Sequence, residues 1–229
     1  MKTAVYICGL LKAFDYTVDS INKNLIIPNN ADVYVSVWNR LGIIDKNLKI
    51  PRQTLRLVDR PITEKDVRKF NNVKNWYIEK HFDTCTDKIG DIQIPQHVKN
   101  KEPIHYYSTI PLSYMTSICN TLHDNNYDRI IKIRPDLLFM NVFNIEHNMP
   151  NDAVFYSSGY NINTHKQVSD KFVGGSVASM NHFCNYYENL NDYWTKTDMV
   201  CEELLKLHMK PFDVQYFKSP VRVVRENLV

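Results

Sequence analysis

The residues with the clearest chemical potential are the two charged side chains of Arg134-Pro135-Asp136. A guanidinium can bind a phosphate through two parallel hydrogen bonds, and a carboxylate can hold a divalent cation or a sugar hydroxyl. The same two side chains could equally form an ion pair that only ends a strand, because charged loop residues are common. The surrounding sequence has to decide between these alternatives.

The segment before this pair is predicted to be a strand. Residues 129–134 alternate between charged and β-branched side chains, and Pro135 has no N–H to donate to a β-ladder. The strand should therefore end near Arg134 and place Asp136 just past its carboxyl end. In open α/β sheets, ligands bind at that edge.

Two other strands are predicted to end at the same edge. Residues 3–8 form a short apolar run that is followed by a turn, in which Gly9 and Leu10 could let a ligand approach the backbone and Lys12 could reach a phosphate. A glycine after a strand can also serve the turn alone. The second strand, 32–37, leads to Trp38, which fits the core slightly better than a wall that stacks on a ligand.

Helices are predicted between the strands. Thr63 and Asp66 have the spacing of a capping box, and the apolar residues after them predict a helix over 64–81. Residues 110–122 carry an apolar side chain every four positions, which predicts another helix. The polar segment 83–103 has no clear period and is predicted to be a long loop or a lid. Alternation of strands and helices indicates a mostly parallel sheet covered by helices.

Two later segments carry further candidate site residues. Asp170 precedes the pair Gly174-Gly175, which suggests close approach of the backbone to a ligand, although a linker or a simple helix start explains two glycines as well. Glu202 and Glu203 lie in the early turns of a predicted helix over 199–209 that Asp198 could cap. Acidic residues in that position are usually partners of the helix dipole.

Composition limits the class of protein. The 229 residues, 44% of them hydrophobic, predict one domain over 1–229. The net charge of +3 is small and its basic residues are interspersed with acidic ones, so nucleic acid is not an expected partner. Five cysteines without a C-x-x-C pair fit a reducing compartment. No run of residues approaches membrane-spanning length, and the apolar start of the chain has no signal-peptide cleavage site.

Five segments together resemble a family of small GT-A-type glycosyltransferases of bacteria and large DNA viruses: 5–14, 30–38, 127–138, 170–176 and 202–208. The resemblance implies a single-domain, Rossmann-like GT-A fold. It also implies a nucleotide-diphosphate-sugar donor, expected to be a UDP-sugar, and a glycan or another hydroxyl as acceptor. The expected location is the cytoplasm, which would be the host cytoplasm for a viral protein.

In this resemblance, Arg134-Pro135-Asp136 stands where other GT-A enzymes carry Asp-x-Asp. A divalent cation, Mn²⁺ or Mg²⁺, would bind Asp136, but one carboxylate in place of two leaves metal dependence open. The cation, Lys12 and Arg134 could share the charge of the departing diphosphate. Glu202, narrowly preferred over Glu203, would be the base of an inverting transfer. The other expected donor-binding residues are Gly9, Leu10, Trp38, Asp170, Gly174 and Gly175.

A second function class remains open at this stage. A non-catalytic domain that binds nucleotide sugars or carbohydrates would need the Arg134 and Asp136 loop but not the late acids. A hydrolase is poorly supported, because the sequence lacks G-x-S-x-G, H-E-x-x-H and P-loop motifs. The donor sugar, the acceptor, the stereochemical outcome and the oligomeric state are not determined by these patterns.

Overall fold

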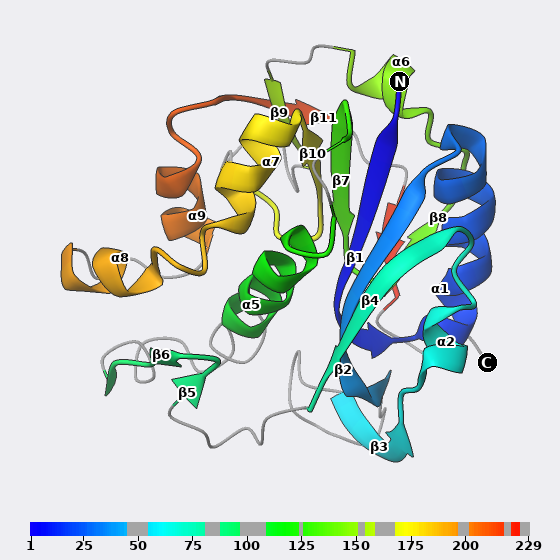
Figure 1. Ribbon diagram of the computed structural model, residues 1–229, viewed down its shortest axis with the longest axis horizontal. Coiled ribbons are helices and arrows are strands. Elements are labelled where there is room, and N and C mark those ends of the chain that lie inside the picture. Colours follow the sequence, from blue (N-terminus) through cyan, green and yellow to red (C-terminus); the bar gives the residue numbers. More distant parts are fainter. Residues whose placement is uncertain are drawn as a thin grey trace.

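A computed structural model describes residues 1–44, 55–80, 88–96, 109–123, 126–150, 154–158, 168–196, 202–217 and 221–224. Their main feature is an eight-stranded sheet that carries helices on both faces (Figure 1). The fold is therefore mixed α/β with a large, mostly parallel central sheet, as the sequence predicts, and it is compatible with a Rossmann-like arrangement.

The centre of the sheet is β1 (Thr3–Lys12), which lies between β2 (Asp32–Ile44) and β7 (Arg129–Ile133) and runs parallel to both. A fourth strand, β4 (Val73–Glu79), runs parallel to β2. These four strands end at one edge of the sheet, here called the carboxyl edge. Gly9 of β1 and Asp136 after β7 both lie there, which confirms the predicted placement of these strands.

The other strands extend the sheet or form small pairs. Beyond β7 the strand order is β10, β9, β11, with β10 antiparallel to both of its neighbours, and β3 pairs antiparallel with the last part of β2. Because β10 runs opposite to β7, its amino end reaches the carboxyl edge. The bounds are β3 Leu55–Pro61, β5 Lys88–Ile89, β6 Ile92–Gln93, β8 Leu137–Phe139, β9 Val154–Ser158, β10 Phe172–Gly175, β11 Asp213–Phe217 and β12 Val221–Val223.

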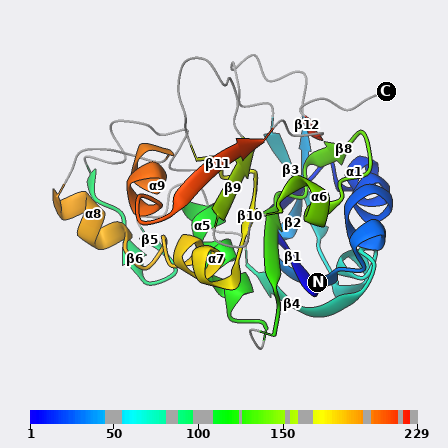
Figure 2. The ribbon, with the colours of Figure 1, turned by 90° about the horizontal axis from the view of Figure 1, so that it is seen from above.

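The helices cover the two faces of the sheet separately (Figures 1 and 2). On one face lie α5 (Thr109–Asn120), α7 (Val177–Cys184), α8 (Leu190–Lys196) and α9 (Glu202–His208). The other face carries α1 (Phe14–Ile21), the short helical turns Asn22–Ile26 and Ile27–Asn29, α2 (Glu64–Val67) and α6 (Ile145–Asn148). Successive residues of β1 enter opposite apolar clusters, with Tyr6 on the α5 face and Ile7 on the α1 face, because side chains alternate along a strand.

The predicted helix over 64–81 is wrong beyond its first turn. The capping box forms as expected, since the backbone N–H of Thr63 donates to the Asp66 carboxylate at 3.0 Å. The helix then ends at Val67, the chain turns through Asn72 with a φ of 56°, and β4 follows. The apolar spacing in 73–79 also suits a strand, and pairing with β2 outweighs the local helical pattern.

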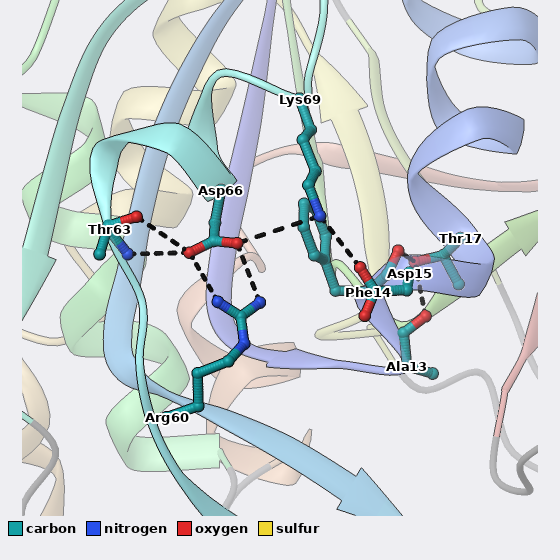
Figure 3. Close-up of polar contacts among 8 residues, drawn as sticks. All are labelled: Ala13, Phe14, Asp15, Thr17, Arg60, Thr63, Asp66 and Lys69. Atoms are coloured by element: carbon teal, nitrogen blue, oxygen red, sulfur yellow. Dashed lines mark hydrogen bonds and ion pairs between the residues drawn. The ribbon is translucent and has the colours of Figure 1, made fainter.

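The helix α2 has only four residues, and charged contacts hold it in place (Figure 3). Both terminal nitrogens of Arg60 donate to the two oxygens of Asp66, and Lys69 bonds Asp15 at the start of α1 at 3.1 Å. Burial alone would raise the pKa of Asp66, but the hydrogen bonds from Arg60 and Thr63 lower it. These contacts connect the α1 and α2 segments on one face of the sheet.

Residues 9–12 form the last part of β1, and the prediction of a turn there is wrong. The strand bulges between Gly9 and Leu11 and then pairs again with the extended end of β2. In the predicted loop 83–103, residues 88–96 are described and contain the β5–β6 hairpin, whereas 83–87, 97–103 and Asp198 lie outside the described residues. Among the described residues, no helix is both long enough and apolar enough to cross a membrane.

Candidate functional site

Arg134 and Asp136 form a two-point ion pair at the carboxyl edge. The Nε of Arg134 donates to Oδ1 of Asp136 at 2.9 Å, and Nη2 donates to Oδ2. Asp136 is buried, with 2% of its surface exposed, whereas 18% of the Arg134 side chain is exposed. The ion pair that the sequence allowed does form. It uses Nε and Nη2 of Arg134, and Nη1 takes no part in these two hydrogen bonds.

Asp170 approaches this pair from the other side. Its Oδ2 lies 3.9 Å from Nη1 of Arg134, and the backbone N–H of Arg134 donates to the carbonyl of Lys171 at 2.9 Å. Burial alone would lower the pKa of Arg134, but the charges of Asp136 and Asp170 raise it, so the guanidinium stays charged. The antiparallel direction of β10 is what brings residue 170 to the carboxyl edge.

Lys132 is a site residue that the sequence analysis did not identify. Its side chain is buried, and Nζ donates a hydrogen bond to the backbone carbonyl of Asp170. Burial lowers the pKa of Lys132, and the nearby Asp170 charge opposes that shift. The sequence contains a signal for its burial. The predicted sheet has helices on both faces, so a lysine between Ile131 and Ile133 in a central strand is expected to be shielded from solvent.

A small cavity of about 20 Å³ lies beside Lys132 and Asp170. Three helices of one face, α5, α7 and α9, contribute to its wall. Its lining consists of Leu112, Ser113, Thr116, Lys132, Asp170, Phe183, Tyr186 and Leu205. The volume is close to that needed by one water molecule, so the cavity cannot hold a phosphate or a sugar ring.

The first segment of the site is shaped by α5. Gly9 has a φ of 111°, a backbone conformation that L residues rarely adopt, and a Cβ here would also come within 2.9 Å of Leu112 Cδ1, so the local backbone accounts for the glycine without a ligand. Leu10 is half-buried against the core on that face. Lys12 ends β1 at the carboxyl edge, and its side chain lies outside the described part of the structure.

Trp38 is part of the core, as the sequence slightly favoured. It is buried, and its ring stacks on Tyr114 with a centroid distance of 6.0 Å. The Tyr114 hydroxyl in turn donates to Glu79 at 3.4 Å. Glu79 is a carboxylate at the carboxyl end of β4 that the sequence analysis did not single out, because the predicted helix 64–81 covered it.

The pair Gly174-Gly175 is not brought next to Arg134 and Asp136. Both glycines are buried within β10, where they pair with Ile131 and Ile130, away from the carboxyl edge. A Cβ on Gly174 would collide with the Ile131 side chain and lie 3.0 Å from Met149 Sδ. Close packing inside the sheet therefore accounts for the glycine at position 174.

Glu202 and Glu203 form the first turn of α9, and their side chains lie outside the described part of the structure. The following residues place the helix: Leu204 and Leu205 are buried, and Leu205 lines the cavity together with Asp170. The far end of α9 is attached to α7, because the imidazoles of His182 and His208 stack at 4.1 Å and each bonds the other's backbone carbonyl.

The described side chains do not form a metal site around Asp136. Within the described ranges, no three His, Cys, Asp or Glu residues converge so that they could hold a metal ion. Both carboxylate oxygens of Asp136 accept a hydrogen bond from Arg134, so the guanidinium already neutralises this carboxylate.

No protein-family model matches this chain, and no curated protein matches it either. The basis for a functional assignment is therefore the arrangement of the chain's own residues together with the resemblance of its segments.

Proposed function

We propose that this protein is a glycosyltransferase that moves a sugar from a nucleotide-diphosphate donor, a UDP-sugar, to a glycan or another hydroxyl acceptor. The observation that carries the proposal is the guanidinium of Arg134, held between Asp136 and Asp170 at the carboxyl edge, where the parallel strands β1 and β7 end. In open α/β sheets that edge is the usual place for a nucleotide.

The groups at this edge suit the departure of a diphosphate. Asp136 takes the Nε and Nη2 donors of Arg134 and so orients the guanidinium, which leaves Nη1 to donate to a phosphate oxygen. Lys12 at the end of β1 would add a second positive charge. The Asp170 carboxylate, close to the same Nη1, would accept a hydrogen bond from a hydroxyl of the donor sugar.

The acid that takes the acceptor proton is assigned to the first turn of α9. Glu202 is preferred to Glu203, and either would act as the base of an inverting transfer. The three described cysteines, Cys8, Cys119 and Cys184, are free thiols, which supports the expected cytoplasmic location. The alternative is a non-catalytic domain of the same fold that binds nucleotide sugars, which would need the Arg134 site without a base.

Donor binding tests the proposal first. A ligand that binds the folded state raises the unfolding temperature, so UDP and UDP-sugars should do so in a thermal-shift screen that includes GDP-sugars. Each is measured with Mn²⁺ and with a chelator. Arg134→Gln should lose the shift, whereas Arg222→Gln, an exposed arginine on β12, should keep it. The absence of a shift with every nucleotide sugar would contradict the proposal.

Substitution of the two acids separates the enzyme from the binding module. Glu202→Gln should lower turnover by a factor of roughly 10² to 10⁴ and leave UDP affinity unchanged. If Glu203→Gln alone has that effect, the base is Glu203. Glu188→Gln, at an exposed position just before α8, is the matched control. Full turnover in both α9 variants would exclude a base in this turn and would make Asp170 the next candidate.

A further inference from the structure

We propose that Lys132 is a positioning residue of the donor site: from within the core it holds the backbone of Asp170, so that the Asp170 carboxylate faces Arg134. This inference rests on the proposed function, because it assigns Asp170 to the donor. Lys132 lies in β7 and Arg134 directly follows this strand, and both side chains reach Asp170. Both reach the short segment that leads into β10.

Residues 169–171, which lead into β10, are each held by a hydrogen bond with a neighbouring segment of the sheet. Lys132 Nζ donates to the carbonyl of Asp170, and the backbone N–H of Arg134 donates to the carbonyl of Lys171. Ser169 is held by its own N–H, which donates to Ser157 Oγ of β9 at 2.7 Å. Three successive residues are thus fixed by neighbours, and Lys132 supplies the contact at the residue that carries the carboxylate.

Lys132 acts on a ligand only through Asp170. Only 1% of its surface is exposed. The cavity beside it, at about 20 Å³, is too small for a phosphate or a sugar. Two other polar residues of its wall, Ser113 and Thr116, both donate their hydroxyl hydrogens to carbonyls of their own helix. The lysine is therefore separated from the carboxyl edge, where a donor would lie.

A simple core role does not explain a lysine at this position. A buried ammonium costs free energy, and an apolar side chain would pack well beside Leu112, Phe183 and Leu205. The neighbouring charges act on this lysine in opposite directions, because Asp170 raises its pKa and Arg134 lowers it. Such a lysine is expected where the benefit lies in the placement of its partner rather than in stability.

The experiment compares Lys132→Met, Asp170→Asn and the double variant. Methionine keeps the length of the side chain and removes the donor, so the unfolding temperature should stay close to that of the unsubstituted protein. Amide hydrogen exchange of residues 168–172 should become about tenfold faster in Lys132→Met, and affinity for the UDP-sugar that gives the largest thermal shift should fall about tenfold, since the hydrogen bond that holds Asp170 is lost. Lys206→Met, an exposed lysine of α9, should change neither quantity.

The double variant distinguishes positioning from general loosening of the fold. If Lys132 acts through Asp170, the double variant should bind this UDP-sugar no more weakly than Asp170→Asn alone. Additive losses, unchanged exchange of residues 168–172 or normal UDP-sugar affinity in Lys132→Met would each overturn the role of Lys132. Failure of the unsubstituted protein to bind UDP would instead contradict the proposed function, and the exchange result would still show whether Lys132 holds the segment.

Discussion

Removing the charge of Asp136 should destabilise the folded protein, because this buried carboxylate is the partner of the Arg134 guanidinium. With 2% of its surface exposed and both oxygens bound to Arg134, it contributes to stability as well as to the site. We expect Asp136→Asn to lower the free energy of unfolding by about 1–3 kcal/mol, because Arg134 loses its charged partner. Urea denaturation at neutral pH measures this change.

The control for that measurement is Asp192→Asn, at an exposed position of α8, where a change within about 0.5 kcal/mol is expected. Equal stability of Asp136→Asn and the unsubstituted protein would mean that the ion pair makes no net contribution. Its purpose would then be only to orient Arg134.

His208 is neutral in the folded protein for a geometric reason. Its Nε2 bonds a carbonyl oxygen, so this nitrogen carries the hydrogen, and Nδ1 must then accept the hydrogen bond from the Tyr193 hydroxyl at 2.7 Å. His182 stacks on the same ring, and Tyr186 packs beside it. The pKa of His208 is lowered to about 4, mainly by burial and to a smaller extent by the neighbouring His182 ring, against a backbone hydrogen bond with His182 that raises it.

This pKa predicts a pH dependence of stability. Between pH 6.5 and about 4 the unfolded chain binds a proton at position 208 that the folded protein does not bind, so stability is full above pH 6.5 and falls as the pH drops. The loss should reach about 3 kcal/mol at pH 4. Urea denaturation at several pH values should show this slope, and His208→Gln should reduce it. An unchanged slope in that variant would assign the pH dependence to other groups.

At the scale of the element, β10 shows how a glycine can serve packing. We expect Gly174→Ala to lower the free energy of unfolding by about 1–3 kcal/mol, because the added methyl group meets the Ile131 side chain and lies 3.2 Å from the Ile130 carbonyl oxygen. Chemical denaturation and UDP affinity are measured together. Weaker UDP binding at unchanged stability would instead assign Gly174 to the ligand site.

Most elements were predictable from local patterns, and the failures have a physical cause. The strands near 3, 32 and 129 and the helix near 110 follow clear apolar periods. The segment 73–79 forms β4 because it pairs with β2. This pairing joins residues that are distant in sequence, so a local pattern does not reveal it. The four residues of β10, two of them glycines, are too few to show a period. Tertiary pairing decided both cases.

The candidate site was predictable to the extent that it depends on strand ends. Arg134 and Asp136 follow from the proline that ends β7, and both lie at the expected edge. The contact of Asp170 with Arg134 depends on the antiparallel direction of β10, which the sequence does not show. Lys132 was missed because a charged residue in an alternating strand is ordinarily exposed.

At the scale of the whole molecule, the two apolar clusters share one sheet, which predicts cooperative unfolding. Trp38 and Trp194 belong to the cluster on the α5 face, and Trp76 packs against the cluster on the α1 face. Tryptophan fluorescence and far-ultraviolet circular dichroism should therefore give one coincident transition in urea. Two separate transitions would show that the faces unfold independently and would contradict a single domain over 1–229.

The position of β1 in the centre of the sheet has a consequence for synthesis. Ala4 pairs with Asp32 of β2 on one side, but its partner on the other side is Ile130, more than half of the chain away. While the ribosome makes the intervening residues, one edge of β1 keeps unpaired backbone groups beside apolar side chains such as Val5 and Ile7. Nascent chains that stop before β7 should therefore aggregate, and the yield of folded protein should improve when translation is slowed or chaperones are supplied.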